Sequence, residues 1–147
     1  MHYTGSNGYN NPTQDLAYAK SVARYGKAAG KTWEYNYLIG LGGNVYEQAG
    51  GFMAAHCLNF NKQSYGVLFM NGIGVEPTDA QVEAFQWLVN TLHAFGSLAV
   101  DAEIVPHYHY RSTACPGLTL ADKPGKAIRT VTGEGRDGKV NAYLLAA

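Results

Sequence analysis

Two histidines and a cysteine in the second half of the chain have a spacing that suits metal ligation. His107 stands eight positions before Cys115, and Pro116 and Gly117 follow the cysteine directly. The run from Ile104 to Leu120 begins with apolar residues, which predicts the end of a strand followed by a loop. Imidazole nitrogen and thiolate sulfur are ligands that zinc favours. A strand end and its loop can place both on one ion, so this run predicts part of a zinc site.

A third ligand has to come from elsewhere, because a catalytic zinc uses three protein ligands and keeps one open position. The start of the chain offers His2, in Met1-His2-Tyr3-Thr4. The second ligand stays open between His107 and His109, since alternate residues of an extended strand point to the same side. His56 is a substitute donor, although we expect it to line the pocket.

The chain has two cysteines, Cys57 and Cys115, which are too few for a disulfide-built scaffold. A single Cys57–Cys115 disulfide remains an alternative to metal ligation, and it would require an oxidising compartment. In the metal-bound interpretation, Cys57 is a small buried side chain.

Composition limits the classes of protein to consider. With 147 residues, 46% of them hydrophobic, the chain is long enough for one domain, 1–147, with a buried core. Its 11 basic and 11 acidic residues give a net charge of +0, which argues against binding nucleic acid through a basic face. No apolar run approaches the ~20 residues of a membrane span. No signal peptide follows Met1, and we expect a monomer.

The first half of the chain predicts a helix and a hairpin. The helix begins at Asn11-Pro12, where Asn suits the N-cap and Pro the first helical position, and it reaches about Gly30. Gln14 stands where a capping-box partner belongs, and the apolar stripe begins at Leu16. The segment from Trp33 to Gln48 predicts a hairpin with strands at 35–39 and 45–48.

The second half predicts a buried strand, a long helix and a short strand. The continuous apolar run 65–70 is typical of a strand buried on both faces. Thr78 and Gln81 form a capping-box pattern before a helix that Gly96 ends. Residues 102–105 predict the strand that leads into the metal-binding loop. Residues 122–147 lack periodicity and predict a C-terminal tail or the start of a linker.

Alternating strands and helices with one hairpin predict an α/β fold, in which a mixed central β-sheet has helices packed on its faces. Sites in open α/β sheets tend to lie outside strand ends. Because His2, Tyr35 and His107 all fall at or beside predicted strand ends, we expect them to share one cleft.

Taken in chain order, these residues resemble the type 2 N-acetylmuramoyl-L-alanine amidases, a family that includes phage lysozyme-like amidases and animal peptidoglycan recognition proteins. The resemblance covers His2 to about Leu120, and any single part of it is weak alone. Its parts are His2-Tyr3-Thr4, the hairpin from Tyr35 to Glu47, Ala55-His56-Cys57 with Asn61, Tyr65-Gly66-Val67, the helix from Thr78 to Leu92, and His107 with Thr113 and Cys115-Pro116-Gly117.

The resemblance implies Zn²⁺ as cofactor, with His2, His107 and Cys115 as its ligands. His107 is preferred to His109 because its spacing to Cys115 matches the family pattern. Zinc lowers the pKa of a bound water to ~7, which provides hydroxide at neutral pH. The thiol has to lose its proton to bind, so we expect metal affinity to fall in acid.

The resemblance also assigns the remaining site residues. Tyr35 takes the position of a catalytic tyrosine, where a phenol can hydrogen-bond the attacking water or the oxyanion. Thr113 takes a position that carries Lys or Thr in the family, and its hydroxyl can donate to the tetrahedral intermediate. Asn36, His56 and Asn61 are candidate substrate contacts.

The implied reaction is hydrolysis of the amide that joins the lactyl group of N-acetylmuramic acid to L-Ala in peptidoglycan. The small chain without a leader suggests a phage endolysin, held in the host cytoplasm until a separate pore-forming protein releases it to the cell wall. Three alternatives remain open: a non-catalytic peptidoglycan-recognition module, an amidase that recycles soluble muropeptides, and a metal-free domain with a Cys57–Cys115 disulfide.

Overall fold

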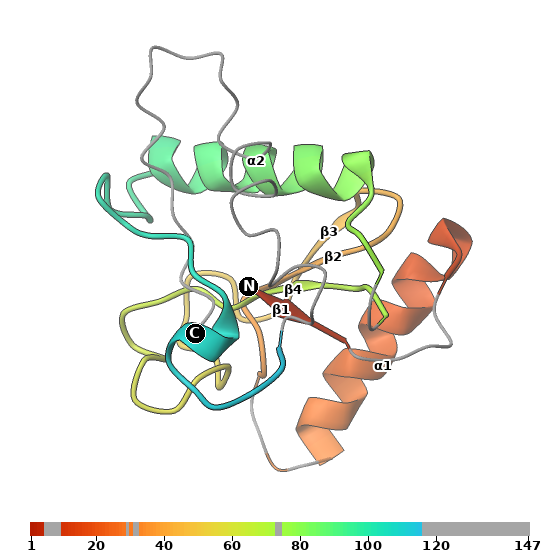
Figure 1. The fold of residues 1–147 in the computed structure, drawn as a ribbon, viewed down its shortest axis with the longest axis horizontal. Helices are drawn as coiled ribbons and strands as arrows, with labels where there is room; N and C mark the ends of the chain where they lie inside the picture. The colour runs from red at the N-terminus through yellow and green to blue at the C-terminus, as the bar shows by residue number, and fades with distance from the viewer. Residues whose placement is uncertain (5–9, 29, 31–32, 73–74, 116–147) are drawn as a thin grey trace.

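The computed structural model describes residues 1–4, 10–28, 30, 33–72 and 75–115 (Figure 1). In chain order its elements are β1 (His2–Tyr3), η1 (Pro12–Gln14), α1 (Asp15–Ala28), β2 (Tyr37–Ile39), β3 (Val45–Glu47), β4 (Val67–Phe69), α2 (Asp79–Ala94) and η2 (His107–His109). The predicted tail or linker at 122–147 lies outside the described residues.

The four strands form one mixed sheet in the order β1-β4-β2-β3. Strand β4 runs parallel to both β1 and β2, whereas β3 pairs with β2 in the antiparallel sense as the return strand of the predicted hairpin. Figure 1 shows α2 on one side of this sheet and α1 on the other. The predicted α/β fold with a mixed sheet and helices on its faces is confirmed.

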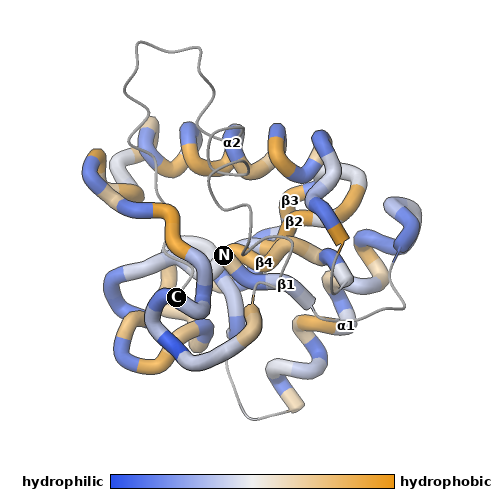
Figure 2. The backbone as a smooth tube through the Cα atoms, viewed as in Figure 1, coloured by the Kyte–Doolittle hydropathy of each residue, from blue (hydrophilic) through white to orange (hydrophobic). Residues whose placement is uncertain are grey.

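Alternation of side chains along β2 and β4 divides the core into two clusters. Ile39 and Phe69 belong to the cluster that includes the inner face of α2, where the rings of Phe69 and Phe85 lie 5.4 Å apart. Leu38 and Leu68 belong to a second cluster that includes Ala19 of α1. Every residue of β2 and β4 is buried, as the run 65–70 predicts, and Figure 2 shows both strands in the apolar colours.

The capping box predicted for α2 is present. The Thr78 side chain accepts from the Gln81 amide at 3.1 Å, and the Gln81 side chain accepts from the Thr78 amide at 3.1 Å. Gln81 also donates to the carbonyl of Ile39 at 3.0 Å, which ties the first turn of the helix to β2. Gly96 follows the helix with φ +67, a conformation that suits glycine.

Helix α1 is anchored to the sheet by a buried acid that the sequence pattern did not reveal. Its carboxylate, on Asp15, accepts from the amides of Leu41 at 3.1 Å and Gly42 at 3.0 Å, and from the Asn44 side chain at 3.3 Å. These bonds fix the start of α1 against the β2–β3 turn. The predicted apolar stripe is wrong at Leu16, which is 53% exposed because this bond network turns the position after Asp15 outward.

The strand predicted at 102–105 is wrong. Ile104 and Val105 are buried, but the backbone of this segment pairs only around Met1, which donates to Val105 at 2.8 Å and accepts from His107 at 3.2 Å. Val105 therefore forms an isolated bridge beside β1, and residues 102–104 form no strand. The chain then passes through Pro106 into η2.

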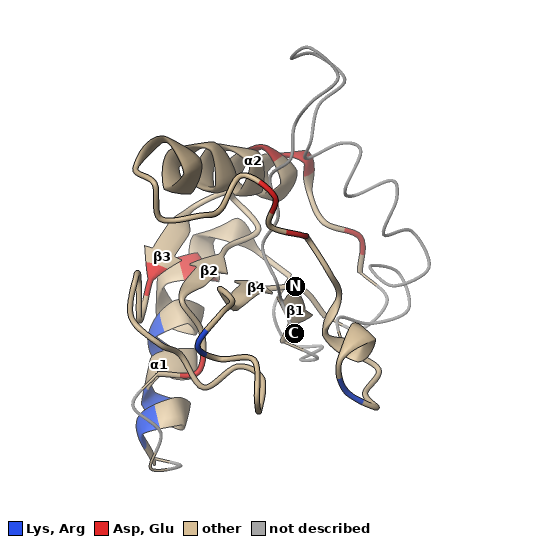
Figure 3. Cartoon of the chain, turned by 90° about the vertical axis from the view of Figure 1, so that its left-hand side faces the viewer, with Lys and Arg blue, Asp and Glu red and all other residues tan. Residues whose placement is uncertain are grey.

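Charged residues are spread over several elements. Among the described residues, Lys20, Arg24 and Lys27 lie exposed on α1, and Figure 3 shows the other blue positions singly in loops. Neither described helix has the length and apolar character that crossing a membrane requires.

Candidate metal centre

His2 is held in place by the sheet although it is the second residue of the chain. Strand β1 pairs with β4 in parallel, with His2 in register with Leu68, and only 2% of His2 is exposed. Met1, which directly precedes β1, is also buried, and burial lowers the pKa of its amino group to about 4. The first strand is therefore a fixed part of the sheet.

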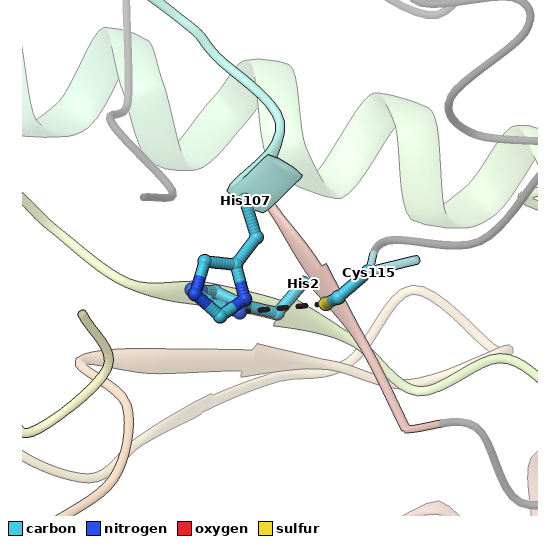
Figure 4. A group of neighbouring side chains, drawn as sticks. All are labelled: His2, His107 and Cys115. Atoms are coloured by element: carbon cyan, nitrogen blue, oxygen red, sulfur yellow. Dashed lines mark hydrogen bonds between the residues drawn. The ribbon is translucent and has the colours of Figure 1, made fainter. Parts of the chain in front are cut away.

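Three side chains from distant parts of the chain meet at this strand (Figure 4). The donor atoms of His2, His107 and Cys115 all lie within 4.8 Å of one another. Nδ1 of His2 faces the Cys115 sulfur at 3.6 Å, and the rings of His2 and His107 have centroids 4.4 Å apart. Two imidazoles and one thiol at this spacing fit a single zinc ion that keeps a fourth position open.

His109 does not join this group. It follows His107 in the same 3₁₀ helix, where residues two apart are rotated by about 240° instead of lying on one side. The His109 ring packs against Tyr110 with centroids 4.7 Å apart, and the residue is exposed. Of the two histidines, it is His107 whose donor atom clusters with those of His2 and Cys115.

The electrostatic state of the group suits a cation. Burial lowers the pKa of His2 well below its usual value and that of His107 to about 4. Both imidazoles are therefore neutral at pH 7, as ligation requires. Burial raises the pKa of the Cys115 thiol, so a metal has to displace that proton.

Tyr35 lies beside the metal group and Thr113 lies at its edge. The Tyr35 ring meets His2 edge to face at 5.1 Å, and burial raises the pKa of its phenol above the ordinary range, which keeps the hydroxyl protonated. Thr113 is exposed, and its hydroxyl oxygen accepts from the Cys115 amide at 3.2 Å. Tyr35 can therefore act as a hydrogen-bond donor near the metal, while Thr113 shapes the backbone of a ligand.

The three residues predicted to contact substrate lie in different settings. Asn36 is 1% exposed, and its amide donates to the carbonyls of Gly50 and Phe52 and accepts from Gly66, each at 2.8 Å. These bonds give Asn36 a structural role and no contact surface for a ligand. Asn61 accepts from the Cys57 amide at 2.6 Å.

His56 lies close to the metal group, and Cys57 follows it in the chain. His56 is 6% exposed, its ring is 5.7 Å from that of His2, and its Nε2 lies 3.2 Å from Ser64. Cys57 is buried, and both it and Cys115 are free thiols, so the alternative disulfide is absent.

A groove of about 410 Å³ lies beside α1. Tyr35 lines it together with Tyr3, Tyr18, Tyr25 and Glu34. The sequence interpretation missed the two tyrosines of α1 because it followed only the aliphatic stripe. Their spacing of seven residues, two helical turns, was the available signal that Tyr18 and Tyr25 share a face.

Comparison with known proteins agrees with this arrangement. A family model described as N-acetylmuramoyl-L-alanine amidase matches residues 1–118. Peptidoglycan-recognition protein SC2 of Drosophila melanogaster is 35% identical over 88 residues, which are 58% of this chain and 48% of that protein. The chain thus spans about half the length of the curated relatives it matches.

Solved structures show the same fold. The bumblebee protein PGRP-SA has a TM-score of 0.75 and 26% identity, with 84% of this chain and 77% of that chain covered. Peptidoglycan recognition protein-LE, solved in complex with tracheal cytotoxin, a monomeric diaminopimelic acid-type peptidoglycan, has a TM-score of 0.72 and 22% identity. That comparison covers 84% of this chain and 76% of the other.

Proposed function

Because the chain belongs to the N-acetylmuramoyl-L-alanine amidase family, we propose that it is a zinc-dependent amidase that acts on peptidoglycan. The bond cleaved is the amide between the lactyl group of N-acetylmuramic acid and L-Ala of the stem peptide. The observation that carries this proposal is the convergence of His2, His107 and Cys115 within 4.8 Å.

The metal group has a defined composition in this proposal. His2, His107 and Cys115 hold the zinc, and the buried Nε2 of His2, which has no partner among the described residues, is the nitrogen left over when Nδ1 ligates. When bound, zinc supplies a Lewis acid for the carbonyl and acidifies a water molecule.

The chain's own side chains then bind and polarise the substrate. The protonated phenol of Tyr35 donates a hydrogen bond to the carbonyl oxygen as negative charge develops on it. Thr113 keeps the Cys115 amide bonded and so stabilises the position of that ligand. The groove beside α1 receives the sugar or the stem peptide against the rings of Tyr3, Tyr18 and Tyr25. The complex of recognition protein-LE with a peptidoglycan fragment supports this class of substrate.

A non-catalytic peptidoglycan-recognition module is the second candidate, because the curated relatives are peptidoglycan-recognition proteins. Such a module would bind wall fragments without cleaving them. Within the catalytic proposal, lysis of intact walls by a phage endolysin and recycling of soluble muropeptides use the same chemistry. Parallel assays on purified sacculi and on soluble muropeptides distinguish these two settings.

The test measures bound zinc and amide cleavage in the same preparations. We expect about one equivalent of zinc and release of stem peptides with a free L-Ala amine from the unmodified chain. Cys115→Ala should lose both, whereas Cys57→Ala, which changes the other free thiol, should keep both. Undiminished cleavage by Cys115→Ala would reject Cys115 as a required ligand, and wall binding without cleavage by the unmodified chain would favour the recognition module.

A further inference from the structure

Two neighbouring imidazoles each carry a buried nitrogen that has no partner among the described residues. These atoms are Nε2 of His2 and Nδ1 of His56. The two rings meet edge to face, with centroids 5.7 Å apart and planes at 80°. Buried polar atoms without partners are rare in folded proteins, so two on adjacent rings require an explanation.

The hydrogen bonds of Ser64 fix which nitrogen of His56 carries its proton. The Ser64 hydroxyl donates to the carbonyl of Phe60 at 2.7 Å, which uses its only hydrogen. The Ser64 carbonyl and hydroxyl oxygen each lie 3.2 Å from Nε2 of His56, and both can only accept there. Nε2 of neutral His56 therefore carries the hydrogen, and its Nδ1 is a bare acceptor.

The contacts of His2 indicate which of its two ring nitrogens carries the hydrogen. Its Nδ1 faces the Cys115 sulfur at 3.6 Å, as the dashed line in Figure 4 shows, so Nδ1 is the ligand atom. A neutral imidazole that ligates through Nδ1 carries its hydrogen on Nε2. Metal-binding histidines almost always donate this second N–H to an acceptor.

The Gly66 backbone also restrains the His56 ring. A Cβ added to Gly66 would overlap Cγ and Cβ of His56, so the imidazole lies directly against the Gly66 backbone. The ring cannot move closer to Gly66, the residue that directly precedes β4, without a shift of that backbone. Two neighbouring rings, with centroids 5.7 Å apart, thus offer one buried donor nitrogen and one buried acceptor nitrogen.

Resting on the proposed function, we propose that His56 is the positioning residue of the metal ligand His2. The Nδ1 of His56 accepts a hydrogen bond from Nε2–H of His2 after a small rotation of either ring, and Ser64 holds His56 through its own Nε2. The chain of contacts Ser64–His56–His2 orients the first ligand towards the metal and fixes its tautomer. His56 therefore acts on the metal through His2, without ligating it.

Zinc affinity, measured by competition with a chromophoric chelator, tests this role in the absence of substrate. His56→Leu removes the acceptor and should weaken zinc binding by 10- to 100-fold, the usual effect of losing an outer partner of a ligand. His56→Asn places an amide oxygen near the position of Nδ1 and should recover most of the affinity. His93→Leu is the matched control, because His93 also has a buried Nε2 without a partner but lies on α2.

Nitrogen-15 NMR of the histidine rings in the metal-free, unmodified chain gives an independent readout and needs no variant to fold. We expect His56 as the Nε2–H tautomer and, after zinc is added, a slowly exchanging Nε2–H on His2. A His56 ring protonated at Nδ1, or His56→Leu with unchanged affinity, would overturn the role of His56. An unmodified chain that binds no zinc would instead overturn the proposed function itself.

Discussion

The amide nitrogen of His107 donates to the carbonyl oxygen of Met1 at 3.2 Å, directly beside the peptide that carries His2. One backbone contact therefore joins two metal-site residues from opposite ends of the described chain. The Cys115 carbonyl accepts from the Tyr108 amide at 3.0 Å, which ties the third residue back to η2. Backbone bonds, rather than the metal alone, preorganise the group.

This arrangement predicts different outcomes for two neighbouring histidines. His107→Ala should weaken zinc binding by roughly 100-fold or more, because it removes a direct ligand where loss of an outer partner already costs 10- to 100-fold. His109→Ala should leave zinc affinity within about twofold, since His109 is exposed and its ring packs on Tyr110. Chelator competition on both variants is the measurement. A larger loss in His109→Ala would contradict the assignment.

Tyr35→Phe should lower kcat by roughly 10²- to 10³-fold, the effect typical of removing one hydrogen-bond donor to an oxyanion. Zinc content should stay unchanged, because the phenol is not among the three clustered donors. Tyr46→Phe, on β3 and not among the residues that line the groove, is the control and should keep kcat. Steady-state cleavage of a soluble muropeptide measures both, and a kcat in Tyr35→Phe equal to that of the unmodified chain would remove Tyr35 from the mechanism.

The elements that the sequence predicts best carry their own start and stop signals. Helix α2 has Thr78 and Gln81 at its start and Gly96 after its end, and β4 is a continuous apolar run. The segment 102–105 has the apolar character of a strand, but its pairing depends on how many residues of β1 reach that edge. A local pattern holds no information about this partner, so the strand prediction failed.

Residue type and spacing predicted a metal group but left its second ligand open between His107 and His109, and only the family resemblance favoured His107. The contacts that support the group were not predictable. Asn36 was a candidate substrate contact, but it is buried and three hydrogen bonds satisfy its amide inside the protein. The contact between Ser64 and His56 depends on the path of the loop between them, where Asn59 adopts φ +77. A positive φ is uncommon outside glycine, and the sequence pattern does not predict it at this position.

Acidification should destabilise the metal-free chain. Burial lowers the pKa of His56 from 6.5 to about 4, and that of His107 shifts in the same direction. Between these pH values the unfolded chain binds protons that the folded chain does not, so stability is full above pH 6.5 and declines as the pH falls to 4. For His56 the loss is on the order of 3 kcal/mol.

Urea unfolding in the presence of a chelator, at intervals across this pH range, measures the decline. His56→Asn removes one titrating group and should give a shallower dependence of the free energy of unfolding on pH. A free energy that stays constant from pH 6.5 to 4 in the unmodified chain would contradict the burial of neutral imidazoles.

Gly66→Ala should impair folding stability and metal binding together. The new Cβ would overlap His56, and the backbone of Gly66 cannot yield because its amide donates to Asn36 at 2.8 Å and its carbonyl accepts from the amides of Asn36 and Tyr37 at 2.9 and 3.2 Å. The His56 ring therefore has to move, at a cost of about 1–3 kcal/mol in the free energy of unfolding. That movement also withdraws the acceptor from His2, so zinc affinity should fall.

Gly51→Ala is the matched control, since its Cβ would meet no atom within 4 Å, and its stability should stay within about 0.5 kcal/mol. Urea unfolding and chelator competition on both variants give the comparison. If Gly66→Ala matches Gly51→Ala in both measurements, the close packing of His56 on β4 does not support the metal group.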